Sequence, residues 1–181
     1  MKRADRQRRR LLLTGLAGVA GVAAPAQAAQ GRELRFSSLS QALEELERMP
    51  EATALDKAGT WSWAQTLQHC AQSIEYSMVG YPQYKSPLFQ RTLGAFAFKV
   101  FALRGHMSHN LREPIPGAPP YRATTSTRTA LRRLRSAIEA FHDTRGELHP
   151  HFAYGVLSKA EYEQAHAMHL ADHFAEFVAR R

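Results

Sequence analysis

Apolar residues recur at helical spacing in five segments of this chain, whereas the alternating apolar and polar runs typical of strands are nearly absent. The spacing predicts helices over about 40–49, 62–79, 86–105 and 127–145, and a fifth that begins at 158. Helices that each carry an apolar stripe must pack those stripes against one another. We therefore expect an all-α protein, an antiparallel four-helix bundle with one accessory helix and one long crossover connection.

Serine residues mark the starts of the expected helices. Ser62 with Gln65, and Ser158 with Glu161, match the capping box, in which each side chain bonds the backbone N–H of the other residue. Ser86 precedes a proline at the first helical position. The third helix is expected to carry an apolar stripe of Phe89, Leu93, Phe96, Ala97, Val100 and Phe101, and the fifth a second stripe of Leu170, Phe174, Phe177 and Val178.

Residues 108–125 form a linker between the third and fourth helices. The linker includes the proline-rich run 114–120, which cannot be helical and favours extended conformations. A connection of about 18 residues is long for a compact domain. We interpret it either as a crossover between distant helices or as a rim around a site.

The N-terminal residues predict a secretory signal peptide. Residues 1–10 hold six basic side chains and one acidic one, residues 11–24 are uncharged, and Ala26-Gln27-Ala28 offers a cleavage site. The uncharged stretch is shorter than the roughly 20 residues that a membrane-spanning helix needs. Arg8 and Arg9, followed by a weakly apolar Gly- and Ala-rich core, favour the twin-arginine route over the general export route.

We expect residues 1–28 to be this signal and residues 29–181 to form one helical domain, periplasmic or secreted, without a stable membrane span once the signal is removed. The mature chain has a net charge of +3 rather than +8. The arginines at 128, 132, 133 and 135 lack interleaved aromatic residues, so they indicate a solvated helix face, and nucleic acid is not expected as a partner. A homodimer is left open.

The single cysteine and the fifth helix narrow the chemistry. Cys70, the single cysteine, excludes an internal disulfide and a Cys-rich zinc site, and its apolar neighbours favour a buried, inert thiol over a nucleophile.

His166, His169 and His173 fall at i, i+3 and i+7 on one face of the fifth helix. His169 and His173 lie about 40° apart around the helix and about 6 Å apart along it, close enough to converge on one metal ion. The alternative is three ordinary polar positions on an amphipathic helix.

A zinc or nickel site with an open position needs about three protein ligands. His69 is the best further candidate because a histidine in the middle of a helix has no capping role, although a satisfied core histidine is the alternative. His106 and His109 are a second possible pair of ligands, but at i, i+3 beside a helix end they are interpreted as a polar helix terminus. His149 is interpreted as an anchor of its loop or as part of the rim of the site.

Three segments of the chain resemble the DinB/YfiT-like helical bundles, and within them the branch defined as domain of unknown function 1569. Residues 61–70 read Trp-x-x-x-x-x-Leu-x-His-Cys, residues 149–162 read His-Pro-x-Phe-x-x-Gly-x-Leu-Ser-x-x-Glu-Tyr, and residues 168–174 read Met-His-Leu-x-x-His-Phe. The chain departs from the pattern by one extra residue between Phe152 and Gly155, and by Tyr162 where Trp is usual. The resemblance extends from about residue 36 onward.

The resemblance implies a DinB-like bundle in which His69, His169 and His173 bind a divalent metal, zinc or nickel, with His166 outside the pattern. The family includes transferases and isomerases that use low-molecular-weight thiols. Such thiols are cytoplasmic, so a metal-dependent hydrolase acting on an unknown small molecule suits an exported protein better. Glu75, Asp172 and Glu176 are candidates for a general base by proximity alone.

Two other functions remain open at this stage. One is a non-catalytic metal- or ligand-binding bundle that acts as an envelope accessory protein. The other is a purely structural bundle without a metal. A pocket with polar groups around an open metal position favours the enzyme, and a triad sealed by apolar side chains favours binding or structure.

The export route can be tested at the arginine pair. Replacing Arg8 and Arg9 with Lys keeps the charge but removes the guanidinium pair that the twin-arginine route requires, so we expect translocation to stop. Fractionation of cells that express the variant measures this. Unimpaired export of the variant would indicate the general route.

Overall fold

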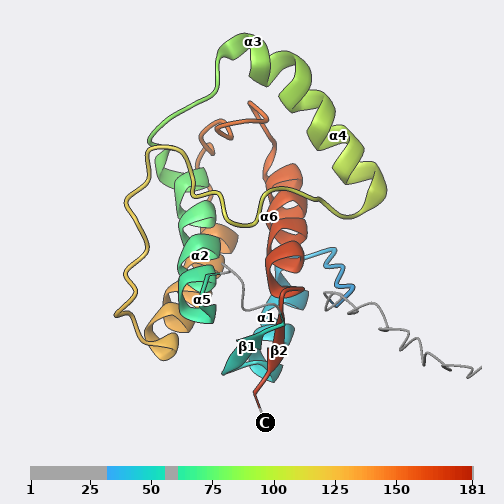
Figure 1. The fold of residues 1–181 in the computed structure, drawn as a ribbon. Helices are drawn as coiled ribbons and strands as arrows, with labels where there is room; N and C mark the ends of the chain where they lie inside the picture. Colours follow the sequence, from blue (N-terminus) through green and yellow to red (C-terminus); the bar gives the residue numbers. More distant parts are fainter. Residues whose placement is uncertain (1–31, 56–60, 181) are drawn as a thin grey trace, which may run out of the picture.

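The structure, a computed structural model, describes residues 32–55 and 61–180 and is mostly helical. Its elements in chain order are α1 (Leu39–Arg48), β1 (Ala52–Ala54), α2 (Trp63–Val79), α3 (Pro87–Phe89), the π-helix η1 (Gln90–Gly94), α4 (Ala95–Arg104), α5 (Thr127–Asp143), α6 (Lys159–Phe174) and β2 (Phe177–Ala179) (Figure 1). The expected signal peptide, residues 1–28, lies outside the described residues.

The expected serine caps define the helix starts. The Ser62 and Gln65 side chains, and those of Ser158 and Glu161, form the reciprocal bonds of a capping box at α2 and α6. Ser86 accepts a bond from the backbone N–H of Phe89 at the start of α3. These bonds satisfy N–H groups that the first helical turn leaves without a partner.

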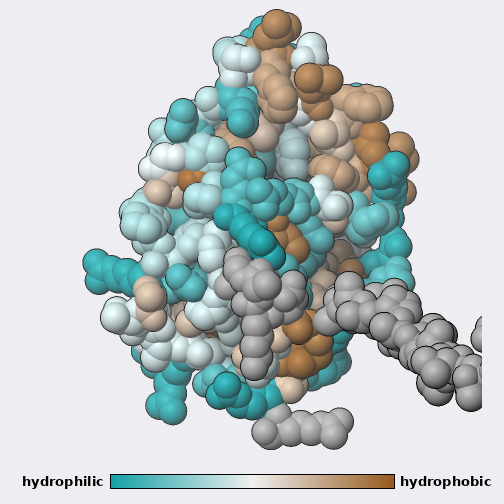
Figure 2. Space-filling view, viewed as in Figure 1, coloured by the Kyte–Doolittle hydropathy of each residue, from teal (hydrophilic) through white to brown (hydrophobic). Residues whose placement is uncertain are grey.

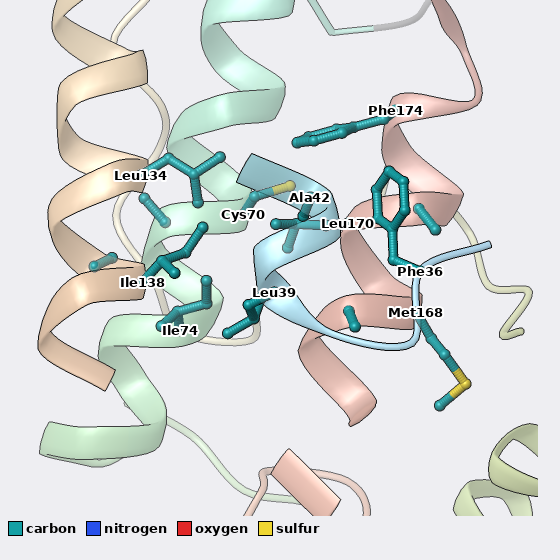
Figure 3. Close-up of a cluster of buried hydrophobic side chains, with 14 of the residues drawn as sticks. Phe36, Leu39, Ala42, Cys70, Ile74, Leu134, Ile138, Met168, Leu170 and Phe174 are labelled. Carbon is teal, nitrogen blue, oxygen red and sulfur yellow. The ribbon is translucent and has the colours of Figure 1, made fainter. Parts of the chain in front are cut away.

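Helix α2 lies at the centre of the fold. It packs along α5 on one side and against α6 on another, and α1 lies against α6 and α5. Leu134 and Ile138 of α5 face Cys70 and Ile74 of α2, while residues of α1 and α6 close the same cluster (Figure 3). Cys70 has no exposed surface, and burial raises the pKa of its thiol, which confirms the prediction of a buried thiol.

The end of the chain differs from the prediction. Phe177 and Val178 were expected to continue the last helix, but α6 ends at Phe174 and both residues lie in β2. This strand pairs antiparallel with β1, with Thr53 opposite Val178. The pairing of β2 with β1 is favoured over a longer helix because it places the Phe177 ring against Trp63, with ring centroids 4.9 Å apart.

The third expected helix also differs from the prediction. It is interrupted by the π-turn η1, and it stands apart from the central helices (Figure 1). Leu93 and Phe96 of the expected stripe are exposed, and Phe98 is the buried residue of α4. Phe98 packs on Tyr154, in the loop before α6, with ring centroids 5.7 Å apart. The helix is apolar on both sides, so its spacing did not identify the buried side.

The long linker has both of the roles considered for it. Residues 105–126 connect α4 to α5 with turns alone, and in Figure 1 they pass across α6 and α2. Part of the same segment lines a cavity beside these two helices. Among the described residues, no helix is both long and apolar enough to cross a bilayer.

The close packing of η1 on the loop before α6 gives a test. A Cβ atom at Gly94 would lie 1.9 Å from the carbonyl oxygen of Ala153, so Gly94→Ala must displace backbone. We expect a loss of about 1–3 kcal/mol in the free energy of unfolding, measured with urea. Gly146→Ala, which has nothing within 4 Å, serves as the control and should gain about 0.4–1 kcal/mol. Equal effects at the two sites would contradict the packing.

Candidate metal centre

The structure brings together the three histidines that the sequence selected. His69 lies in the middle of α2, and His169 and His173 lie on the face of α6 that packs against it. Nε2 of His69 is 3.0 Å from Nε2 of His169. The His173 ring centroid lies 4.6 Å from that of His69 and 4.7 Å from that of His169. The predicted convergence of these side chains is confirmed.

A fourth imidazole joins them. His109, in the linker after α4, was expected to form a polar helix terminus, and that expectation is wrong. One ligand atom from each of His69, His109, His169 and His173 lies within 4.8 Å of the others. Nδ1 of His109 lies 2.9 Å from Oδ2 of Asp172, so a carboxylate stands behind this imidazole.

The arrangement fits a divalent cation. Zn–N bonds of about 2.0–2.1 Å in tetrahedral geometry place ligand nitrogens about 3.4 Å apart, close to the separation of the His69 and His169 nitrogens. Both ring nitrogens of His173 and Nδ1 of His169 are buried without a hydrogen-bond partner among the described residues. Buried polar atoms without partners are costly, and a cation bound to one nitrogen of His173 would satisfy that nitrogen. Imidazole nitrogens are ligands that zinc and nickel accept.

The electrostatics of the cluster keep the imidazoles of His69, His169 and His173 neutral. Burial, and then the neighbouring His109, lower the pKa of His69 to about 3. Burial is also the first cause that lowers the pKa values of His169 and His173 well below their usual range, and the neighbouring histidines add to it. Neutral imidazole is the form that binds a metal, so the fold prepares these side chains for ligation.

The linker orients His69 from outside the cluster. The hydroxyl of Tyr121 lies 2.6 Å from Nδ1 of His69, which leaves Nε2 directed at the cluster. Gln68, the preceding residue of α2, holds this part of the linker: its Nε2 donates to the carbonyl of Arg122 at 3.1 Å, and its Oε1 accepts from the N–H of Arg122 at 3.2 Å. Such second partners fix the ring orientation and tautomer of a metal ligand.

Trp61 covers the cluster from another side. Its ring stacks on His173, with centroids 6.0 Å apart and planes 11° apart, and lies 4.9 Å from the His69 ring. The same indole also packs edge-on against Tyr121. This tryptophan, part of the motif that carries the family resemblance, therefore limits the access of water to His69 and His173.

A cavity of about 220 Å³ opens beside the cluster. Three of the four imidazoles line it, those of His69, His109 and His169. Its other walls come from α2, α6, the proline-rich linker and the loop before α6, and they are mainly apolar. Lys85 and Glu113 are the charged side chains of its lining. The histidine cluster is thus accessible to a small molecule.

The remaining histidines have other surroundings. His166 lies outside the cluster, between Phe141 and Tyr162, and also lines the cavity. His106 contacts the Arg104 carbonyl at the end of α4, which confirms a polar helix terminus at this one residue of the pair. The backbone of His149 anchors its loop: its N–H donates to Ser77, and its carbonyl accepts from the Tyr162 hydroxyl.

The three carboxylates considered as bases differ in position. Both oxygens of Glu75 accept bonds from Arg133, at 2.8 and 2.6 Å, so this carboxylate is held in an ion pair. Asp172 reaches the site through His109. Glu176 follows the end of α6, and its backbone N–H donates to His173. Asp172 is therefore the carboxylate that stands next to the cluster.

Sequence reasoning missed His109, Tyr121 and Gln68. Their signals were weak: His109 stood at i+3 from His106 at a helix end, and Tyr121 directly followed the proline-rich run. Gln68 could have been noticed as a polar residue beside His69 in a helix of mainly apolar environment. None of the three belongs to a periodic pattern.

Comparison with protein families gives one match. The family described as "Protein of unknown function (DUF1569)" matches residues 28–180. Comparisons with curated proteins and with solved structures gave no match.

The buried His166 predicts how stability depends on pH. Burial lowers its pKa from 6.5 to about 3, so between these values the unfolded chain binds a proton there that the folded chain does not. The stabilisation is complete above pH 6.5 and is lost as the pH falls towards 3, by about 1.4 kcal/mol per pH unit. His166→Phe should flatten this slope in urea unfolding, whereas Phe141→Leu should leave it unchanged. Identical slopes in all three proteins would contradict the assignment.

Proposed function

This chain belongs to the DUF1569 family, and we propose that it is an exported, DinB-like metal protein in which His69, His169 and His173 hold a divalent cation. Zinc or nickel suits a set of imidazole ligands. The proposal includes the four-helix bundle of the DinB-like proteins, with α1, α2, α5 and α6 as its helices. The basic and apolar pattern of residues 1–28 supports export.

One observation carries the proposal: four imidazoles from three separate segments meet within 4.8 Å, in an environment that keeps the three from α2 and α6 neutral. A satisfied core histidine has a hydrogen-bond partner, and the nitrogens of His173 have none among the described residues. Three core histidines with no common ligand would not need to point at one another.

We assign the function of a metal-dependent hydrolase or transferase acting on a small molecule in the cavity. A cation held by three imidazoles with an open position acts as a Lewis acid towards a bound group. Tyr121 holds His69 in its orientation, and Trp61 excludes water from the side opposite the substrate. The apolar linker wall would hold the body of the substrate, and the Asp172 carboxylate stands 2.9 Å from the imidazole of His109. Hydrolysis is favoured over thiol-dependent transfer by the proposed export.

A second candidate function is supported by His109. If its imidazole stays in the cluster, four nitrogens complete a tetrahedral set and close the metal to substrate. The protein would then be a non-catalytic metal- or ligand-binding bundle. The two functions differ in whether a coordination position exchanges.

Metal content tests the proposal. The protein purified without a His-tag should contain a divalent metal, and a chelator should lower its thermal midpoint. Binding to the native state alone adds about 2.7 kcal/mol at a hundredfold excess over Kd. His173→Ala should lose the metal and the chelator effect, while His166→Ala, the same change one to two turns away on α6, should keep both. Equal loss in the two variants would show that the ligand set is wrong.

Cobalt substitution separates the two functions. In the Co²⁺-loaded protein, azide should change the visible spectrum if a coordination position is open, and it should leave the spectrum unchanged if His109 closes the site. His109→Ala should then retain the metal and make the closed form responsive to azide.

A further inference from the structure

The outward side of the segment α3–η1–α4 carries large apolar side chains that the described part of the chain leaves uncovered. Leu88 is 73 % exposed, Leu93 65 %, Phe96 67 % and Leu103 89 %. We call these four residues the outer apolar face. Figure 2 shows apolar side chains gathered over the end of the molecule where α3 and α4 lie. Soluble monomers seldom expose contiguous apolar surface of this kind without a partner for it.

The charged residues within this segment and just before it have one sign. Residues 82–104 contain four basic residues and no acidic one: Lys85, Arg91, Lys99 and Arg104, all exposed. Lys99 lies near Glu161 of α6, whose pKa is lowered first by bonds to Ser158 and to a smaller extent by this lysine. The other three have no acidic ion-pair partner within the described residues.

We propose that the outer apolar face docks the protein on the surface of an anionic lipid bilayer. Helices that lie in a membrane interface combine exposed Leu and Phe side chains with Lys and Arg at their flanks. The apolar side chains enter the region below the headgroups, and the basic side chains meet lipid phosphates. No helix of the described residues is both long and apolar enough to cross a bilayer, so the segment would lie on the surface.

A second copy of this chain fits the face less well. A two-fold dimer through this surface would place the same patch of each subunit against its counterpart. The basic side chains of Arg91, Lys99 and Arg104 would then lie in an interface between two basic surfaces, and residues 82–104 supply no carboxylate to pair with them. An anionic bilayer provides the opposite charge that a second copy lacks.

The inner side of the same segment fixes it in place. Phe98 is buried, Gly94 packs against the carbonyl of Ala153, and Nε2 of Gln90 donates to the carbonyl of Phe152 at 3.1 Å. The helix is therefore formed before docking and presents its outer face without rearrangement. Phe152 and Tyr154 of this loop also line the cavity, so docking would place the cavity about one helix diameter, roughly 10 Å, from the bilayer.

A site-specific label tests the proposal in the full chain. Leu93→Cys and Ser136→Cys, an exposed control on α5, are each labelled with a polarity-sensitive thiol dye; the native Cys70 is fully buried. With vesicles that contain phosphatidylglycerol, the dye at 93 should shift to the blue and the dye at 136 should not. Neither should shift with pure phosphatidylcholine. A dye that stays in water at position 93 would overturn the proposal, even if residues 1–28 tether the chain to the vesicle.

Matched charge variants test the electrostatic part. In the Leu93→Cys protein, Arg91→Glu with Arg104→Glu should weaken vesicle affinity at least about tenfold, because each basic residue near an anionic surface contributes to binding. Arg128→Glu with Arg132→Glu, the same charge change on α5, should leave affinity within about twofold. Equal effects of the two pairs would overturn the proposal. A second pair of results would also overturn it: the dye at position 93 does not respond to vesicles, and the unlabelled protein self-associates unless Leu93→Glu and Phe96→Glu are introduced. The face would then join two copies of the chain.

Discussion

The arrangement around the candidate site depends on two neutral imidazoles that face each other in the interior. Nε2 of His69 and Nε2 of His169 are 3.0 Å apart, and burial disfavours the charged form of both. Two such nitrogens can share one proton, or they can share a cation. Asp172 stands behind His109, and no ion pair is found between a carboxylate and either His69 or His169 within the described residues. Neutral imidazoles are the form that binds a metal, so the metal that we propose would take the place of the shared proton without charging either ring.

Helix α2 places several polar side chains in the core. Gln68, His69 and Gln72 are all buried on the helix that packs between α5 and α6. The linker supplies hydrogen-bond partners for two of them. Its backbone at Arg122 bonds both ends of the Gln68 amide, and its Tyr121 hydroxyl bonds His69. A proline-rich segment suits this task because its extended backbone has few internal bonds to lose. The linker is thus part of the core as well as a connection.

Local signals predicted the parts of this fold that local interactions determine. The capping boxes at Ser62 and Ser158 located two helix starts, and spacing alone placed His169 and His173 on one face. His109 and Tyr121 were not predicted because each is far from its partner in the sequence; Tyr121 and His69 are 52 positions apart. The path of the linker also depends on tertiary hydrogen bonds. Phe177 was assigned to a helix because pairing with β1 leaves no trace in its periodicity. Leu93 and Phe96 were misjudged because a helix with two apolar sides does not show which one is buried.

The position of the cavity determines what each histidine could contribute to a metal site. The cavity reaches His69, His109 and His169, whereas His173 lies away from it beneath the Trp61 ring. Any exchange at a bound cation would therefore occur on the side of the linker. His109 is the exposed member of the four, and its Nδ1 lies 2.9 Å from Oδ2 of Asp172. The closed four-histidine site and the open three-histidine site that we propose would differ in the position of this one linker residue. Loss of the Asp172 contact would favour the open state, because it would remove the partner that keeps His109 against the cluster.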